Sequence, residues 1–346
     1  MVFDPLLPSH RLAWLFARLA TPLAAAAFAV FAAWPSPVPA QVANFHPCNS
    51  QPSLPICLHG YGRRIAVQRW GALPEPIDPD ASAKASLVTS DPAAEIKKLK
   101  SATVIVEDVD TSEVLFARKA DTVRPIASIT KLMTALVVVD ADLPMDEMIG
   151  IVSADRKLGS DLPSRLPKGT SLSRSDLLHL ALTASANTAA HALARSYPGG
   201  IEAFVQAMNT TAQALGMTDS NFADPTGLSN QNVSTAKDLV KLIEAASERP
   251  LIHEFSTDTK HKAAGRTFRN TNMLVGRPHW DILISKTGTT RKAGDCLVML
   301  IQLDGRKLAI VLLDGQGMNA ARFGDAVRVR RIVSSEMAVD ATQAMR

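Results

Sequence analysis

The order of strand-forming and helix-forming stretches constrains the fold of this chain more than any other feature. Two β-branched runs at 103–106 and 113–116 flank a turn, which predicts a pair of antiparallel strands. Three more apolar runs near the end predict strands at 280–289, 296–303 and 308–313, with Asp304-Gly305 as a hairpin turn between the last two. Between these groups, apolar residues recur with helical spacing. The predicted helices are 126–139, 177–182, a segment after 187 that ends by 198, 202–215 and 235–246, with a closing helix at 320–333. We therefore predict an α+β domain (α/β in the broad sense), in which an antiparallel sheet of about five strands from both ends of the segment carries an inserted helical block.

A hydroxyl and an amine stand three residues apart where the helix predicted at 126–139 begins, in Ser128-Ile129-Thr130-Lys131. Residues at this spacing share a helical face, so Lys131 can reach Ser128. An amine kept neutral by burial or by another cation is one of the groups that can activate a serine. The pattern recurs at Ser234-Thr235-Ala236-Lys237, where a helix cap followed by an exposed lysine explains it. The apolar neighbours of Lys131 predict a buried helix, in which an idle charge would be costly.

Two further motifs follow in order, Ser185-Ala186-Asn187 and Lys286-Thr287-Gly288. The first lies between two predicted helices, where a helix cap is the alternative role for Asn187. The second ends a predicted strand, and Gly288 would allow a substrate backbone to approach that edge closely. Ser-x-x-Lys, Ser-x-Asn and Lys-Thr-Gly together occur in penicillin-binding proteins and class A β-lactamases. From about Ser101 to Phe323 the chain resembles the low-molecular-mass penicillin-binding proteins, which are serine DD-peptidases.

Within that family the chain is most similar to the D-alanyl-D-alanine endopeptidase branch. The stretches that carry this closer similarity are Pro125-Ile126-Ala127-Ser128-Ile129-Thr130-Lys131-Leu132-Met133-Thr134-Ala135, Tyr197-Pro198-Gly199-Gly200, Pro225-Thr226-Gly227-Leu228 and Asn270-Thr271-Asn272. The resemblance implies the penicillin-binding/β-lactamase-like fold, with a DD-peptidase domain at 101–346. It also implies an enzyme that hydrolyses D-alanyl bonds of peptidoglycan peptides through an acyl-enzyme.

The resemblance assigns a role to each residue of the motifs. Ser128 would attack the carbonyl carbon, neutral Lys131 would accept its proton, and Ser185 would relay a proton to the leaving amine. Asn187, Lys286, Thr287, Gly288 and Thr289 would bind substrate: Asn187 its amide, Lys286 and Thr287 its carboxylate, with the backbone N–H groups of Ser128 and Thr289 as the oxyanion hole. Lys286 could also be the second cation that lowers the pKa of the catalytic amine. The implied enzyme needs no metal or cofactor and is trapped covalently by β-lactams.

Several other functions share parts of this pattern. A D-alanyl-D-alanine carboxypeptidase has the same three motifs and differs only in removing a free terminal D-alanine. A class A β-lactamase uses a glutamate for deacylation, and the loop at 219–232 contains none; its central carboxylate is Asp224. A non-catalytic penicillin-binding sensor would have lost Ser128, Lys131 or Lys286. The eight histidines have no spacing typical of a zinc peptidase, and packing or surface roles are expected for His179 and His191.

The first forty residues are predicted to be a cleavable signal peptide. Arg11 and Arg18 flank the start of an alanine-rich apolar run that ends before Val38-Pro39-Ala40. Removing this segment, with its two arginines and one aspartate, changes the formal charge from +4 to +3, which does not favour a nucleic-acid partner. We expect a periplasmic protein without a stable membrane anchor.

Residues 41–100 are proline-rich and predict a mostly irregular arm, with a short helix near 91–98. An oxidising compartment permits a disulfide between Cys48 and Cys57 in this arm, with two unpaired thiols as the alternative. Cys296 lies in a predicted strand and is expected to be a buried, inert thiol.

Overall fold

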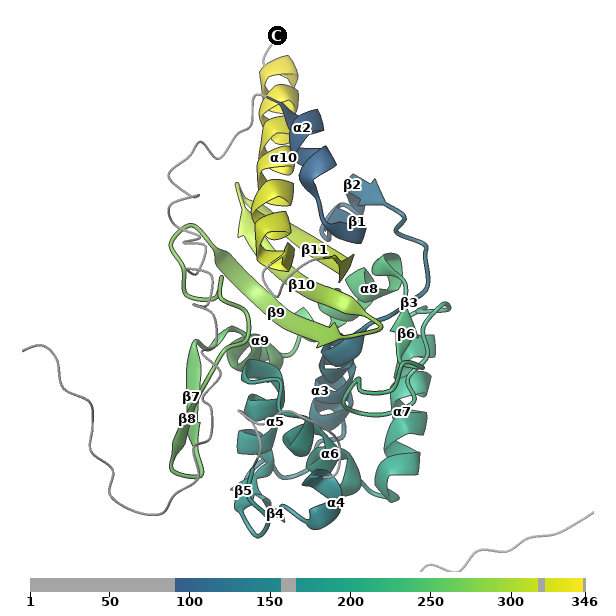
Figure 1. The fold of residues 1–346 in the computed structure, drawn as a ribbon, viewed down its shortest axis with the longest axis vertical. Helices are drawn as coiled ribbons and strands as arrows, with labels where there is room; N and C mark the ends of the chain where they lie inside the picture. Colours follow the sequence, from purple (N-terminus) through teal and green to yellow (C-terminus); the bar gives the residue numbers. More distant parts are fainter. Residues whose placement is uncertain (1–90, 157–165, 317–320, 345–346) are drawn as a thin grey trace, which may run out of the picture. The chain divides into compact units, whose positions relative to one another are not determined.

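The computed structural model describes residues 91–156, 166–316 and 321–344, which belong to one compact unit spanning Arg69–Arg346 (Figure 1). The predicted signal peptide at 1–40, the arm from 41 to 90 and the pair Cys48 and Cys57 lie outside these described residues. The short helix predicted at the end of the arm is present as α2, Pro92–Lys98, whose first turn is capped by the Asp91 side chain. Helix α2 packs against the last helix, so the folded part of the chain begins before the predicted boundary at 101.

A five-stranded antiparallel sheet forms the upper layer of the domain in Figure 1, with the strand order β2-β1-β11-β10-β9. Its strands are β1 Ser101–Asp108, β2 Glu113–Arg118, β9 Asp281–Thr290, β10 Gly294–Leu303 and β11 Arg306–Gly315. Strand β1 pairs with β11 from Ser101 opposite Gly315 to Asp108 opposite Leu308. The prediction that the two ends of the segment meet in one sheet is therefore confirmed.

The central strands carry apolar residues at consecutive positions, and successive side chains of a strand point to opposite sides. Both faces of the sheet are therefore apolar. In β1, Val104 and Val106 contribute to a core beneath the closing helix α10, Ala321–Ala344, whereas Ile105 points into the helical block. Figure 1 shows α10 over one face and the inserted helices beyond the other. Each face of the sheet therefore belongs to a separate core, and a one-residue shift in register would exchange the side chains of the two cores.

The inserted block carries the remaining elements. Its helical elements are η1 Ala127–Ile129, α3 Thr130–Asp140, α4 Ser153–Arg156, α5 Arg174–Thr183, α6 Asn187–Arg195, α7 Gly200–Ala214, α8 Ala236–Ser247 and α9 Pro250–Thr257. Its short strand pairs are β3 Arg124–Pro125 with β6 Val233–Ser234, β4 Met148–Gly150 with β5 Ser171–Ser173, and β7 Lys260–Ala263 with β8 Arg266–Arg269. Helix α9 and the β7–β8 hairpin were not predicted, since the hairpin is mostly exposed and lacks a sustained apolar period. None of the helices that the structure describes is long and apolar enough to cross a membrane.

Two groups of histidine and carboxylate side chains hold the helical block together. Asp155 is fully buried; burial disfavours its charge, but hydrogen bonds from His191 and Arg195 outweigh this and lower its pKa to about 2. The His179 ring stacks 3.8 Å from the His261 ring, and burial together with His261 lowers the pKa of His179 to about 4. Both predicted histidines thus have packing roles.

Candidate active site

Ser128 lies in the 3₁₀ turn η1, immediately before helix α3. The turn is strained at Ala127, which has a φ of +48°. It is held in place from two sides: Ile126 N–H donates to the Asn232 carbonyl, and Thr130 Oγ1 donates to the Ala127 carbonyl. These contacts fix the serine at the N-terminal end of a buried helix, where the positive end of the helix dipole favours a developing anion.

Lys131 is completely buried, and its amine contacts three oxygen atoms. Nζ lies 2.9 Å from Ser128 Oγ, 2.6 Å from Asn187 Oδ1 and 2.7 Å from the Thr226 carbonyl oxygen. Neither the carbonyl nor the amide oxygen can donate a hydrogen, so each must accept one from the amine. In its neutral form the amine would give its two hydrogens to these oxygens and could turn its lone pair toward the Ser128 hydroxyl. The predicted proximity of Ser128 Oγ and Lys131 Nζ is present, at a distance that permits proton transfer.

The second motif brings Ser185 and Asn187 to the same place from the connection between α5 and α6. Ser185 has a left-handed φ of +55°, and its Oγ lies 2.9 Å from Lys286 Nζ. Asn187 is the first residue of α6, whose cap is Ala186 without any side-chain cap bond. The alternative that Asn187 serves only as a helix cap is therefore wrong, because its amide oxygen is engaged by Lys131.

Lys286 projects from β9 with only 1% of its surface exposed. Burial is the main cause that lowers its pKa well below the usual value for lysine, and the positive charges of Lys131 and Arg322 add to the effect. Its Nζ donates to Ser185 Oγ and to the Thr287 carbonyl, both at 2.9 Å. Lys286 therefore lies close enough to Lys131 for the two amines to interact electrostatically, and its role as the second cation stays a prediction.

Strand β9 passes directly against the serine turn at Gly288. A Cβ at this position would lie 3.0 Å from both Ser128 N and the Ile126 carbonyl oxygen, which is tighter than most real contacts. Glycine is needed here so that the strand can approach the chain's own serine turn. Gly288 also lines the cavity beside it, where the sequence predicted close approach of a substrate.

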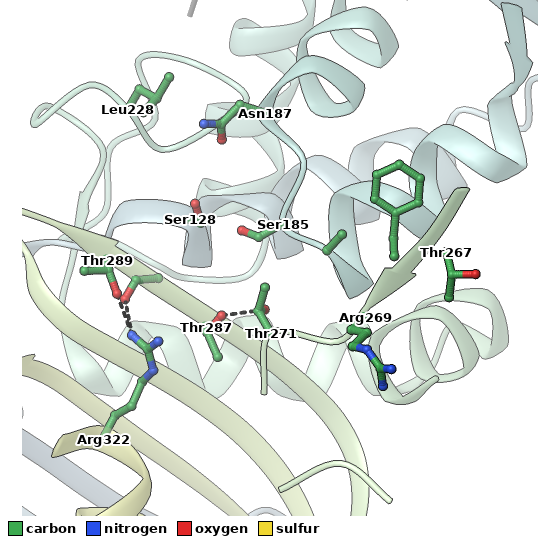
Figure 2. A pocket seen from close by; sticks show the side chains of 13 residues that line it. Ser128, Ser185, Asn187, Leu228, Thr267, Arg269, Thr271, Thr287, Thr289 and Arg322 are labelled. Atoms are coloured by element: carbon green, nitrogen blue, oxygen red, sulfur yellow. Dashed lines mark hydrogen bonds between the residues drawn. The ribbon is translucent and has the colours of Figure 1, made fainter. Parts of the chain in front are cut away.

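Two hydroxyl side chains of β9 flank this glycine. Thr287 Oγ1 lies 2.7 Å from Thr271 Oγ1, and Thr289 Oγ1 lies 2.9 Å from Asp295 Oδ1. Arg322, at the start of α10, donates to the Thr289 hydroxyl, to the Gly288 carbonyl and to Asp295 (Figure 2). The edge of β9 therefore offers hydroxyl groups backed by positive charge, which suits a carboxylate ligand.

The loop at 224–232 closes the site opposite β9. The Asp224 carboxylate is partly buried, which opposes its charge, but hydrogen bonds from Thr226, Ser229 and Gly227 hold its pKa below the usual value. Gly227 has a φ of +85°, and a Cβ there would lie 1.9 Å from the Ala127 carbonyl oxygen. The loop is thus locked against the serine turn and presents the Thr226 carbonyl to Lys131.

These elements surround one cavity of about 600 Å³ (Figure 2). Six of the predicted residues line it: Ser128, Ser185, Asn187, Thr287, Gly288 and Thr289. The other two, Lys131 and Lys286, are buried behind the cavity wall. The sequence did not predict Thr271, Leu228, Arg322 or the β8 residues Thr267, Phe268 and Arg269 as lining residues. Thr271 and Leu228 belong to stretches singled out for their similarity, but Arg322 and β8 carry no motif.

The fold and this cavity define the class: a serine hydrolase of the penicillin-binding type. A model of the D-alanyl-D-alanine carboxypeptidase family matches residues 88–317, and the chain belongs to that family of serine-type D-Ala-D-Ala peptidases. It is 43% identical over 261 residues to a D-alanyl-D-alanine endopeptidase of Escherichia coli, covering 74% of this chain and 83% of the relative. It is 45% identical over 241 residues to a D-alanyl-D-alanine endopeptidase of Pseudomonas aeruginosa, covering 68% and 77%.

Solved structures show the same fold. A DD-transpeptidase of a Streptomyces strain superposes with a TM-score of 0.64 at 25% identity, covering 68% of this chain and 98% of its own. A penicillin-binding protein of Listeria monocytogenes in its ampicillin-bound form superposes with a TM-score of 0.62 at 31% identity, covering 68% and 97%. The predicted penicillin-binding fold is therefore confirmed.

Proposed function

We propose that this protein is a D-alanyl-D-alanine endopeptidase that hydrolyses cross-links between peptidoglycan peptides through an acyl-enzyme at Ser128. One observation carries the catalytic part of the proposal. The buried amine of Lys131 lies 2.9 Å from Ser128 Oγ, and the Asn187 and Thr226 oxygens, which carry no hydrogens, accept hydrogen bonds from the same amine. Such an amine is positioned to take the hydroxyl proton as the serine attacks.

The other contacts supply the remaining steps of acyl transfer. Ser128 Oγ would bond to the D-alanyl carbonyl carbon, and its proton would pass to Lys131. Ser185, hydrogen-bonded to Lys286, would relay to the departing amine the proton that Lys131 took from Ser128, so that each hydroxyl and amine of the enzyme other than Ser128 ends the step as it began. The backbone N–H groups of Ser128 and Thr289 would stabilise the oxyanion, a contribution of about 3 kcal/mol per donor in other hydrolases. Water then hydrolyses the ester.

Substrate binding would use the edge of β9. Thr287 and Thr271 would hydrogen-bond the carboxylate next to the scissile amide, and Lys286 would support them from behind. Arg322 adds positive charge at the Thr289 end of the same edge. Asn187 would hydrogen-bond the substrate amide through the part of its side chain that Lys131 does not engage. These roles are consistent with a substrate that has a carboxylate next to the leaving nitrogen.

The choice of endopeptidase over carboxypeptidase is supported by similarity. Identity is 43–45% to the two endopeptidases and 30% to a D-alanyl-D-alanine carboxypeptidase of Mycobacterium tuberculosis. The test is to incubate purified protein with cross-linked muropeptide dimers and with monomeric pentapeptides, and to identify the products by mass. We expect dimers to be converted to monomers. Loss of terminal D-alanine from monomers while dimers stay intact would replace the proposal with a carboxypeptidase.

We also propose that β-lactams acylate Ser128 and are released slowly. In the loop at 219–232, where a deacylating glutamate would be expected, the central carboxylate is Asp224, which already accepts hydrogen bonds from its own loop. Nitrocefin should therefore give stoichiometric acylation, and rapid multiple turnover would instead indicate a β-lactamase. Action on peptidoglycan requires export, and the pattern of residues 1–40 supports a periplasmic location.

A further inference from the structure

Arg269 is an exposed cation at one end of the catalytic cavity with no anionic partner. It ends strand β8 and lines the cavity, and its side chain makes no hydrogen bond or ion pair with any residue that the structure describes. Lys260, on the neighbouring strand, stands directly opposite it in register. Like charges facing each other across a strand pair are unfavourable. An anionic ligand at this end of the cavity would relieve that repulsion.

The position of Arg269 places it on the side of the leaving group. Lys286 donates a hydrogen bond to Ser185, which is the proposed proton donor to the leaving amine. Lys286 is also the residue next to Thr287 on β9. The hydroxyls of Thr287 and Thr271 are hydrogen-bonded to each other, and Arg269 precedes Thr271 by two residues in the chain. Figure 2 shows Arg269 beyond Thr271, with its guanidinium directed away from Ser128. A group that reaches Arg269 must therefore extend past the leaving nitrogen and past its neighbouring carboxylate.

The chain segment that carries Arg269 is fixed on both sides of the guanidinium. Phe268 is buried in the core of the helical block, so the alternate residues Thr267 and Arg269 face outward. Immediately after Arg269, the Asn270 side chain donates to the carbonyls of Ser256 and Asp258. Thr271 N–H donates to the Thr183 carbonyl at 2.9 Å. The guanidinium is thus carried by an ordered strand, which reduces the entropy lost when it binds a ligand.

We propose that Arg269 binds a carboxylate of the second peptide in a cross-linked substrate, the peptide that leaves when Ser128 is acylated. This proposal rests on the proposed endopeptidase function and deepens it. A free terminal D-alanine ends at the carboxylate next to the scissile bond, which the Thr287–Thr271 pair would hold. In a cross-link the leaving nitrogen belongs to a side chain of a second peptide, which continues outward and ends in its own carboxylate. Arg269 therefore recognises cross-linked substrates and not single peptides.

The test uses two cross-linked dimers that differ in one group. In one dimer the terminal carboxylate of the leaving peptide is free, and in the other it is amidated. We would measure kcat/KM on both dimers for the wild-type protein, Arg269→Ala and Arg269→Lys. The control is Lys262→Ala, which removes one exposed positive charge from the same hairpin but lines a separate hollow with Asp176. Thermal unfolding of each variant verifies that it is folded.

Wild type should prefer the free-carboxylate dimer. Arg269→Ala should lower that preference about fivefold to tenfold, mostly through KM, because a charge-assisted hydrogen bond to the carboxylate is lost. Arg269→Lys should retain part of the preference, and Lys262→Ala should leave it unchanged. An unchanged preference in Arg269→Ala, or an equal loss in Lys262→Ala, overturns the assignment of Arg269 while leaving the endopeptidase function intact. Wild-type protein that leaves both dimers uncut overturns both proposals.

Discussion

Replacing Gly227 with alanine tests how strongly the loop at 224–232 positions Lys131, the proposed proton acceptor. The new Cβ would lie 1.9 Å from the Ala127 carbonyl oxygen and 2.9 Å from Ser128 N, so one of the two backbone segments must move by about 1 Å. The left-handed φ of +85° costs alanine about 1–2 kcal/mol, and the overlap costs about 1–3 kcal/mol more. The total cost is about 2–5 kcal/mol, and at about 2–4 °C per kcal/mol for a domain of this size the melting temperature should fall by roughly 4–20 °C.

The same displacement should slow acylation. Gly227 follows Thr226, whose carbonyl holds the Lys131 amine at 2.7 Å, and an error of about 1 Å in a catalytic group can cost about 100-fold in rate. The matched control is Gly305→Ala, since Gly305 has a φ of +83° but no atom within 4 Å of its added Cβ. Both variants would be compared by thermal unfolding and by the rate of labelling with a fluorescent penicillin. Near wild-type labelling by Gly227→Ala would refute the idea that the loop positions Lys131.

Three further changes test other parts of the structure. As pH falls from 6.5 toward 4, the unfolded chain binds a proton at His179 before the folded protein does, so the wild-type protein loses stability in this range. His179→Phe should therefore lose less stability than wild type between about pH 7.5 and pH 5, measured by urea unfolding. An equal loss in both proteins would argue against a buried neutral histidine. Asp155→Asn should lower stability by about 3 kcal/mol because the partly buried His191 and Arg195 lose the counter-charge of a fully buried carboxylate, with penicillin labelling unchanged at temperatures where the variant is folded. Asn187→Ala should slow labelling about tenfold to hundredfold because the Lys131 amine loses an acceptor, and labelling at the wild-type rate would contradict that contact.

The local patterns of the sequence predicted most of the sheet and the serine–lysine pair. The β-branched run in β1, the hairpin signal at Asp304-Gly305 and the spacing of Ser128 and Lys131 each depend on residues close in the chain. Pairing of β1 with β11 followed from the order of the predicted elements. Cys296 is buried as predicted, and burial raises the pKa of its thiol to about 12.

The parts of the site that the sequence did not predict depend on contacts between distant segments. The bond from Lys131 to Asn187 joins residues 56 positions apart and exists only because α6 packs beside α3. Arg322 reaches Thr289 from the far end of the chain, where no motif marks it. The β7–β8 hairpin is polar and largely exposed, so its sequence resembles a loop although Arg269 lines the cavity. In each case the function of the residue arises from tertiary packing.

The most direct measurement is the rate at which a β-lactam acylates the wild-type protein and Lys131→Met, with the modified peptide identified by mass spectrometry. Methionine fills the buried site with a side chain of similar length but carries no amine. If Lys131 accepts the proton of Ser128, the adduct should map to Ser128, and the variant should be acylated about 10²–10⁴-fold more slowly while it unfolds at a temperature near that of wild type. An adduct on another residue, or a folded Lys131→Met variant acylated at the wild-type rate, would contradict this mechanism.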